Sequence, residues 1–227
     1  AQVNTCRFTV EEALAALEAG GVRAEKHPWM PDCLLLDGSG DLERLRAFQE
    51  GMIYIQDPAA RLAALAADLR SGNRVLDVCA APGGKSFAAA IAMEDRGEII
   101  ACDLHENKLK RVREGAARLG LTSIHGKAAD GRVFLEEWRN AFDVVLVDAP
   151  CSGLGILRKK PDIRRKRADS LFTLPVVQSA ILENAARYVR PGGTLLYSTC
   201  TVLPEENEEV TDAFLGTHPE FSRETFL

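Results

Sequence analysis

The sequence lacks the patterns that mark membrane-bound and secreted proteins. No apolar run approaches the roughly 20 residues that a membrane-spanning helix needs, and no charged N-terminal segment precedes an apolar stretch, as it would in a signal peptide. The six cysteines form no CxxC pair and no zinc-like cluster with histidines. These absences predict a cytoplasmic protein with reduced, mostly buried cysteines and no bound metal.

The chain also lacks the excess of positive charge that is typical of nucleic-acid-binding proteins. It has 28 Lys and Arg against 33 Asp and Glu, a net charge of −5, but net charge describes solubility rather than a local site. Seven basic residues are concentrated in one short run: Arg158, Lys159, Lys160, Arg164, Arg165, Lys166 and Arg167. Such a run is either a solvated surface or a phosphate-binding segment.

From Gly72 onward the chain alternates between strand-like and helical patterns. Strands are predicted at 74–80, 98–104, 122–130, 142–150 and 193–200, with Pro191-Gly192-Gly193 as the turn into the last. Helices are predicted at 85–93, 106–119, 174–189 and 205–215. This alternation predicts an α/β fold with a doubly wound, mostly parallel, Rossmann-like sheet.

The first 70 residues follow a different pattern. Thr9 and Glu12 predict a capping box for a helix through Ala19. Short strand patterns at 22–25, 33–36 and 51–57 precede a helix at 58–69. We therefore expect a small N-terminal α/β subdomain over residues 1–70 and a Rossmann-like domain over 71–227. Only a polar tail follows the last helix, so we expect the C-terminal strands of such a sheet to be missing.

The segment DVCAAPGGKS, residues 77–86, combines a strand end, a glycine-rich turn and a helix start. Glycines there allow a ligand to approach the helix N-terminus closely. Gly84, Lys85 and Ser86 match the end of a P-loop, but Cys79 stands where its first glycine belongs, and the dinucleotide pattern GxGxxG is absent. The remaining interpretation is a nucleoside cofactor without a pyrophosphate.

Acidic residues end three successive predicted strands, namely Asp103, Asp130 and Asp148. Asp103 lies 19 residues after Gly84, where a carboxylate can bind both hydroxyls of a ribose, and Asp130 could accept an adenine amino group. A single Asp is often only a turn former or a cap. Three in register favour a ligand site at the carboxyl edge of the sheet.

Two cysteines follow neighbouring predicted strands. Cys151 comes directly after Asp148-Ala149-Pro150, and Cys200 ends the last strand. A lone cysteine is usually an inert core residue. Because these strands should be adjacent in a doubly wound sheet, we expect both thiols and Asp148 to face one crevice.

Together these motifs resemble the RNA cytosine-5 methyltransferase family, and within it the bacterial Fmu/Sun-type enzymes of 16S rRNA. The resemblance covers nearly the whole chain and rests on these segments: QDPAA (56–60), DVCAAPGGKS, the Asp103 and Asp130 positions, DAPCSG (148–153), LRKKPDIRRKR (157–167) and STCTVLPEENEEV (198–210). Members of that subgroup carry an N-terminal helical RNA-binding domain. The resemblance therefore implies that this chain is the catalytic part without that domain.

The resemblance implies a class I S-adenosylmethionine-dependent methyltransferase, active as a monomer, that methylates carbon 5 of a cytosine in 16S rRNA through a covalent cysteine adduct. It assigns Cys200 as the nucleophile and Cys151 to product release, a ranking that the residues alone do not provide. Asp148 is placed to hydrogen-bond the cytosine. The cofactor-binding residues would be Cys79, Ala80, Ala81, Pro82, Gly83, Gly84, Lys85, Asp103, Asp130 and Asp148.

Several alternatives stay open at this point. The substrate could be tRNA or large-subunit rRNA, the chain could be a DNA cytosine-5 methyltransferase in which Cys151 attacks, or it could bind cofactor and RNA without catalysis. Lys85 is either an electropositive site residue or a solvated lysine at a helix start. The basic run follows Cys151 closely, which favours RNA binding over a solvated surface. Helix initiation alone explains the acidic PEEN segment at 204–207.

Overall fold

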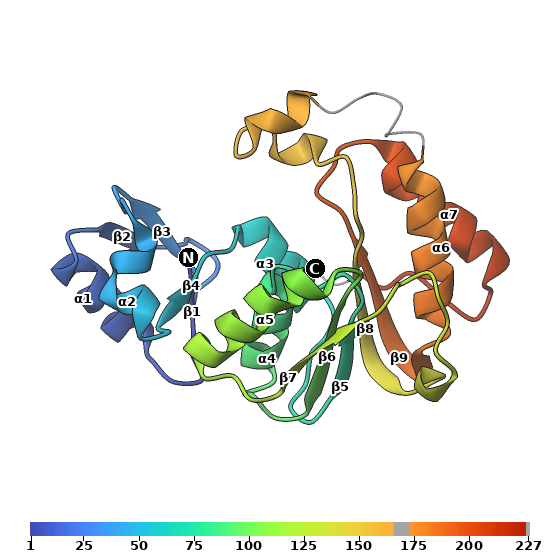
Figure 1. Cartoon of the computed structure of the whole chain (residues 1–227), viewed down its shortest axis with the longest axis horizontal. Coiled ribbons are helices and arrows are strands. Elements are labelled where there is room, and N and C mark those ends of the chain that lie inside the picture. The colour runs from blue at the N-terminus through green and yellow to red at the C-terminus, as the bar shows by residue number, and fades with distance from the viewer. Residues whose placement is uncertain (166–172, 226–227) are drawn as a thin grey trace.

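The computed structural model describes residues 1–165 and 173–225 (Figure 1). Its main body is a parallel sheet with the strand order β7-β6-β5-β8-β9. The strands are β5 (Arg74–Asp77), β6 (Glu98–Asp103), β7 (Ile124–Ala128), β8 (Phe142–Asp148) and β9 (Val189–Ser198). The predicted doubly wound α/β fold is confirmed.

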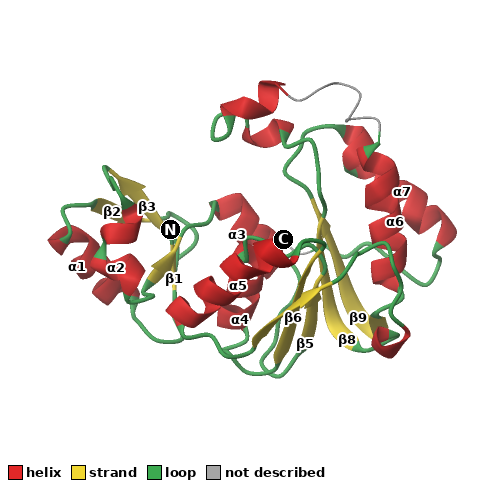
Figure 2. Cartoon of the chain, in the orientation of Figure 1, coloured by secondary structure: helices red, strands yellow, loops and turns green. Residues whose placement is uncertain are grey.

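Helices cover both faces of this sheet (Figure 2). On one side, helix α3 (Pro58–Leu65) packs on α4 (Gly84–Ala92), next to α5 (Glu106–Leu119), and the other side carries α6 (Leu174–Ala186) and α7 (Glu208–Thr217). Short 3-10 turns connect the larger elements: η1 (Leu42–Arg44), η2 (Glu136–Trp138), η3 (Leu154–Ile156), η4 (Pro161–Arg165) and η6 (Pro204–Glu206). No helix in the described part of the chain is long and apolar enough to cross a membrane.

The N-terminal part has a small core of its own. Strand β1 (Gln2–Val3) pairs with β4 (Ile53–Tyr54), and β2 (Arg23–Lys26) pairs with β3 (Leu34–Asp37), both antiparallel. Helices α1 (Val10–Ala19) and α2 (Arg46–Gln49) pack against them. The predicted capping box of Thr9 and Glu12 is present at the start of α1. The domain boundary at 70/71 stays a prediction.

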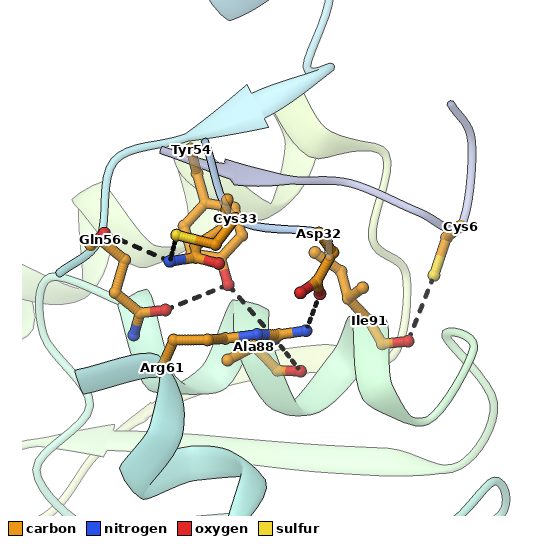
Figure 3. A network of polar contacts seen from close by, with 9 residues as sticks. Cys6, Asp32, Cys33, Tyr54, Gln56, Arg61, Ala88 and Ile91 are labelled. Carbon is orange, nitrogen blue, oxygen red and sulfur yellow. Dashed lines mark hydrogen bonds and ion pairs between the residues drawn. The ribbon is translucent and has the colours of Figure 1, made fainter. Parts of the chain in front are cut away.

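A buried arginine fastens this N-terminal part to the main body (Figure 3). Arg61 of α3 is 3% exposed. Its guanidinium donates to Asp32 Oδ2 at 2.6 Å and to the carbonyl oxygen of Ala88 in α4 at 3.1 Å. Removing one partner of a buried ion pair leaves an uncompensated charge. Arg61 thus fixes the N-terminal part against α4, the helix that begins at the glycine-rich turn.

Several boundaries differ from the sequence-based expectation. Pro191-Gly192-Gly193 lies inside β9 rather than before it, because a register shift opposite Phe142 and Val144 absorbs the irregular backbone. The predicted helix at 205–215 divides into η6 and α7. The third strand of the sheet ends at Ala128, so Asp130 lies in the following loop.

Candidate active site

The carboxyl ends of the parallel strands bring polar side chains to one edge of the sheet. The last residues of β5, β6, β8 and β9 are Asp77, Asp103, Asp148 and Ser198. Strand β5 lies between β6 and β8. The chain runs outward from β5 to β6 and β7 and then crosses back to β8 on the other side of β5. Such a switch point is where open α/β sheets bind ligands.

The glycine-rich turn approaches this edge as a tight backbone loop. Gly83 is the N-cap of α4 and has φ +113°. A Cβ at this position would lie 2.5 Å from Cζ of the Phe87 ring, so both the backbone conformation and the space favour glycine. The turn therefore exposes backbone amides and the positive end of α4, which suit a polar or anionic ligand group.

The residues predicted to line the cofactor site surround this turn. Ala80 is buried and its amide donates to the carbonyl oxygen of Cys102 at 2.7 Å, whereas Ala81 is half-buried and Pro82 is exposed. Burial raises the pKa of the Cys79 thiol far above its ordinary value. Cys79 therefore stays protonated and contributes an apolar wall.

Asp103 and Asp130 differ in their surroundings. Asp103 is 8% exposed, and its Oδ1 accepts from the amide of His105 at 3.0 Å. Asp130 is held by the guanidinium of Arg132, which donates to both carboxylate oxygens at 2.9 and 2.7 Å. These hydrogen bonds from Arg132 lower the pKa of Asp130. Asp130 thus already has a partner in the position where an adenine amino group was expected.

Asp77 is a site residue that the sequence analysis did not identify. It is fully buried and accepts a hydrogen bond from Ser86 Oγ at 2.7 Å. Its Oδ1 is buried and has no hydrogen-bond partner among the described residues. Burial raises the pKa of this carboxyl to about 6. Its position at the end of β5, in line with Asp103 and Asp148, was the available signal.

Lys85 and Asp148 form an ion pair that links α4 to β8. Lys85 Nζ lies 2.7 Å from Asp148 Oδ2, and the lysine side chain is 11% exposed. Ser198 Oγ donates to the other carboxylate oxygen of Asp148 at 3.0 Å. The interpretation of Lys85 as a solvated surface lysine is therefore wrong. Asp148 is held on both oxygens, and its remaining lone pairs can accept from a ligand.

The two thiols predicted to share a crevice are in contact. Cys151 Sγ and Cys200 Sγ lie 3.2 Å apart, and the amide of Cys200 donates to Cys151 Sγ at 3.3 Å. This hydrogen bond between the thiols lowers the pKa of Cys200 to about 7, assisted by Lys85 and Lys160 and opposed by burial and Asp148. The same contact raises the pKa of Cys151 above its ordinary value. The contact therefore favours the thiolate form of Cys200.

The basic run continues from the Cys151 loop. Arg158, Lys159, Lys160 and Arg165 are exposed, and Lys159 pairs with Asp57 at the start of α3. Residues 154–165 lie above the carboxyl ends of β8 and β9 in Figure 1. Arg164 belongs to η4, whereas Lys166 and Arg167 lie outside the described residues. In the described ranges, no group of three or more His, Cys, Asp or Glu is placed to hold a metal ion.

Comparisons with known proteins identify the family. The family described as 16S rRNA methyltransferase RsmB/F matches residues 64–226, and its ferredoxin-like domain family matches residues 1–43. The probable ribosomal RNA small subunit methyltransferase B of Bacillus subtilis is 42% identical over 100% of this chain and 51% of its own length.

Solved structures are similar as well. The crystal structure of PH0851 has a TM-score of 0.94 at 37% identity and covers 97% of this chain and 50% of that one. A methyltransferase homolog from Pyrococcus horikoshii has a TM-score of 0.81 at 32% identity, covering 95% of this chain and 68% of that one. The chain spans about half the length of the curated relatives that it matches.

Proposed function

The chain belongs to the RsmB/F family of 16S rRNA methyltransferases, and from this premise we propose that it transfers a methyl group from S-adenosylmethionine to carbon 5 of a cytosine in 16S rRNA. One observation carries the proposal. Cys151 and Cys200 lie in sulfur–sulfur contact on adjacent strand ends, beside the Asp148–Lys85 ion pair and the glycine-rich turn. The names of the relatives support rRNA as the substrate.

The residues around the turn fit S-adenosylmethionine. The buried Oδ1 of Asp77, which lacks a hydrogen-bond partner among the described residues, matches a cofactor that brings its own donors. Asp103 would bind the ribose hydroxyls, and the backbone from Cys79 to Lys85 would enclose the rest. Bound there, the cofactor would supply an electrophilic methyl group.

Carbon 5 of cytosine needs activation, because it is a weak nucleophile. The thiolate of Cys200 adds to carbon 6, forming a sulfur–carbon bond and shifting an electron pair toward carbon 5, which takes the methyl group. A base then accepts the carbon 5 proton, the electron pair of that bond re-forms the carbon 5–carbon 6 double bond, and Cys200 leaves as a thiolate. We assign assistance of this release to Cys151. This is covalent catalysis, which divides a difficult step into easier ones.

Asp148 and Lys85 support the addition step. The carboxylate of Asp148 accepts a hydrogen bond from the cytosine amino group, which fixes the base, and the neighbouring Lys85 ammonium supplies the positive charge that stabilises the negative charge developing on the ring as the thiolate adds. Lys85 holds the carboxylate in one orientation at 2.7 Å. The contact between the sulfurs lowers the pKa of Cys200 and raises the pKa of Cys151, and this direction supports Cys200 as the nucleophile.

An enzyme that acts on a base must reach it outside a stacked helix. The exposed cations Arg158, Lys160 and Arg165 follow the Cys151 loop and would contact phosphates beside the target nucleotide. We assign the same role to Lys159, Arg164, Lys166 and Arg167. The alternative is that the same crevice accepts a cytosine of tRNA or of large-subunit rRNA.

The experiment replaces each thiol and mixes the protein with S-adenosylmethionine and RNA that contains 5-fluorocytosine, which blocks the release step. We expect a denaturation-resistant adduct with the unchanged protein and with Cys151→Ala, and none with Cys200→Ala. An adduct with Cys200→Ala but not with Cys151→Ala would overturn the assignment and indicate the chemistry of DNA cytosine-5 methyltransferases.

The RNA class is tested with fluorinated transcripts of 16S rRNA, 23S rRNA and tRNA in parallel reactions. Preferential adduct formation with the 16S transcript supports the proposal, and preference for another transcript supports the alternative. Calorimetric titration with S-adenosylmethionine and tritium transfer to unmodified RNA separate binding from turnover. Binding without any transfer or adduct would indicate a scaffold.

A further inference from the structure

A buried carboxylate connects the two loops that carry the thiols. Glu206, in η6 after the Cys200 loop, is 1% exposed. Its Oε2 accepts from the amide of Ser152 at 2.9 Å and from Gln178 Nε2 at 2.8 Å. The same Gln178 nitrogen donates to the carbonyl oxygen of Pro150 at 3.0 Å. Glu206 therefore holds the residues on both sides of Cys151, one directly and one through Gln178.

Further hydrogen bonds join the same two loops. Ser152 Oγ lies 2.6 Å from Thr201 Oγ1, and the amide of Gly155 donates to the carbonyl oxygen of Cys200 at 3.0 Å. Within the Cys200 segment, the hydroxyl of Tyr197 donates to the carbonyl oxygen of Glu206 at 2.8 Å and attaches η6 to β9. The segment around Cys151 is thus attached to the segment around Cys200 at several points, with the Glu206 carboxylate as its charged member.

Helix initiation does not explain this carboxylate. An acid that stabilises a helix start interacts with the amides of its own first turn and can stay hydrated. The neighbouring Glu205 is exposed in this way. Glu206 instead bonds to an amide 54 residues away in the sequence. Burying a carboxylate costs free energy unless hydrogen bonds compensate it, so its burial needs a reason outside η6.

We propose that Glu206 is a positioning residue for the thiol pair, which sets the separation of Cys151 and Cys200 by holding the Ser152 amide and Gln178. The catalytic consequence rests on the proposed function, whereas the geometry of the thiols does not. Replacement by Ala removes the acceptor from two donors and releases the Cys151 loop. The contact at 3.2 Å between the sulfurs then loosens, and with it the hydrogen bond that favours the Cys200 thiolate.

The glutamine variant separates hydrogen bonding from charge. Glu206 Oε1 has no hydrogen-bond partner among the described residues, so an amide nitrogen in its place breaks none of the hydrogen bonds that Oε2 accepts. The amide oxygen can still accept from Ser152 and Gln178. Glu206→Gln should therefore keep the thiol pair in place, whereas Glu206→Asp, which is one methylene shorter, should not.

The test measures alkylation of Cys200 by iodoacetamide as a function of pH, with the whole chain and without RNA or cofactor, by mass spectrometry of the Cys200 peptide. We expect midpoints near the value of about 7 for the unchanged protein, for Glu206→Gln and for the exposed control Glu205→Ala. The midpoints of Glu206→Ala and Glu206→Asp should rise by about one pH unit. Circular dichroism identifies the folded variants.

Unchanged midpoints in folded Glu206→Ala or Glu206→Asp would overturn the proposal, as would a raised midpoint in Glu206→Gln. If Glu206→Ala does not fold, the aspartate and glutamine variants decide. Adduct formation with fluorinated RNA is measured in parallel, and we expect it to slow in the alanine variant and to recover with glutamine. If the unchanged protein itself forms no adduct, the proposed function fails, while the alkylation profiles still decide the role of Glu206.

Discussion

Asp77 provides the sharpest test of the electrostatics at the sheet edge. Burial raises its pKa from 3.8 to about 6. Since one pKa unit corresponds to about 1.36 kcal/mol, ionised Asp77 should cost the folded protein about 3 kcal/mol relative to the unfolded chain. Asp77→Asn removes this cost while its amide oxygen can still accept from Ser86 Oγ. We therefore expect the variant to be more stable than the unchanged protein at neutral pH.

The direction of the pKa shift fixes how the stability difference between Asp77→Asn and the unchanged protein depends on pH. A folded-state pKa above the unfolded value means that the stabilising contribution of Asp77 is present below pH 3.8 and is lost as the pH rises through about 6. Between pH 5 and pH 8 the advantage of Asp77→Asn should grow by about 1.5 kcal/mol. Urea unfolding at several pH values, followed by circular dichroism, measures this difference.

Asp95 serves as the contrasting control. Burial opposes its ionisation, but hydrogen bonds from Ser123 and Thr122 outweigh burial and lower its pKa. Its stabilising contribution is therefore present above the unfolded pKa and lost as the pH falls, so Asp95→Asn should be most destabilised at high pH. Equal pH dependence for the Asp77→Asn and Asp95→Asn variants, or a flat difference for Asp77→Asn, would refute the reasoning.

Other variants test the thiols, the ion pair and the basic run. Alkylation of Cys200 should increase about tenfold per pH unit below a midpoint of about 7. Cys151→Ala should move that midpoint toward 9.0, the ordinary pKa of a cysteine thiol; an unmoved midpoint would contradict the thiol–thiol hydrogen bond. Lys85→Met should slow adduct formation with fluorinated RNA about a hundredfold, whereas the exposed Lys110→Met should leave the rate unchanged; equal rates would exclude a role for the ion pair. Lys160→Ala should weaken RNA binding at low salt and reduce the slope of log affinity against log salt by about one; a filter-binding titration with an unchanged slope would place this lysine away from phosphate.

The parts of the site that follow from strand order could be predicted from the sequence. Parallel strands end at the same edge, so Asp103, Asp148 and the two cysteines could be placed together from the sequence alone. Helix α5 matches its predicted bounds, 106–119, because a marked amphipathic pattern ends at Gly120, which caps it in the left-handed conformation. Periodicity and capping residues suffice to predict the bounds of a helix when both signals lie in the helix itself.

Most of the remaining features depend on contacts between segments far apart in the sequence. Asp130 is an exception, because its partner Arg132 is only two residues away. The sequence still did not indicate that the carboxylate would bind this arginine rather than a ligand. The burial of Lys85 depends on Asp148, 63 positions later, and that of Glu206 on the Cys151 loop. The sequence left Lys85 open between a site residue and a solvated lysine and explained the PEEN segment by helix initiation, because local patterns contain no information on which loops meet.

Two of the residues that the sequence analysis missed are buried acids at the same edge of the sheet. Both Asp77 and Glu206 carry one oxygen without a hydrogen-bond partner among the described residues, and a fold selected only for stability would replace such groups with neutral ones. Proteins retain local violations of this kind at functional sites, where an optimally stable arrangement would not hold the reacting groups. Asp77 borders the glycine-rich turn and Glu206 the thiol pair, so the two acids lie beside the proposed donor and nucleophile. If Asp77→Asn gains stability but loses affinity for S-adenosylmethionine, the stability cost of this carboxylate serves cofactor binding; a stabilised variant with unchanged affinity would remove that explanation.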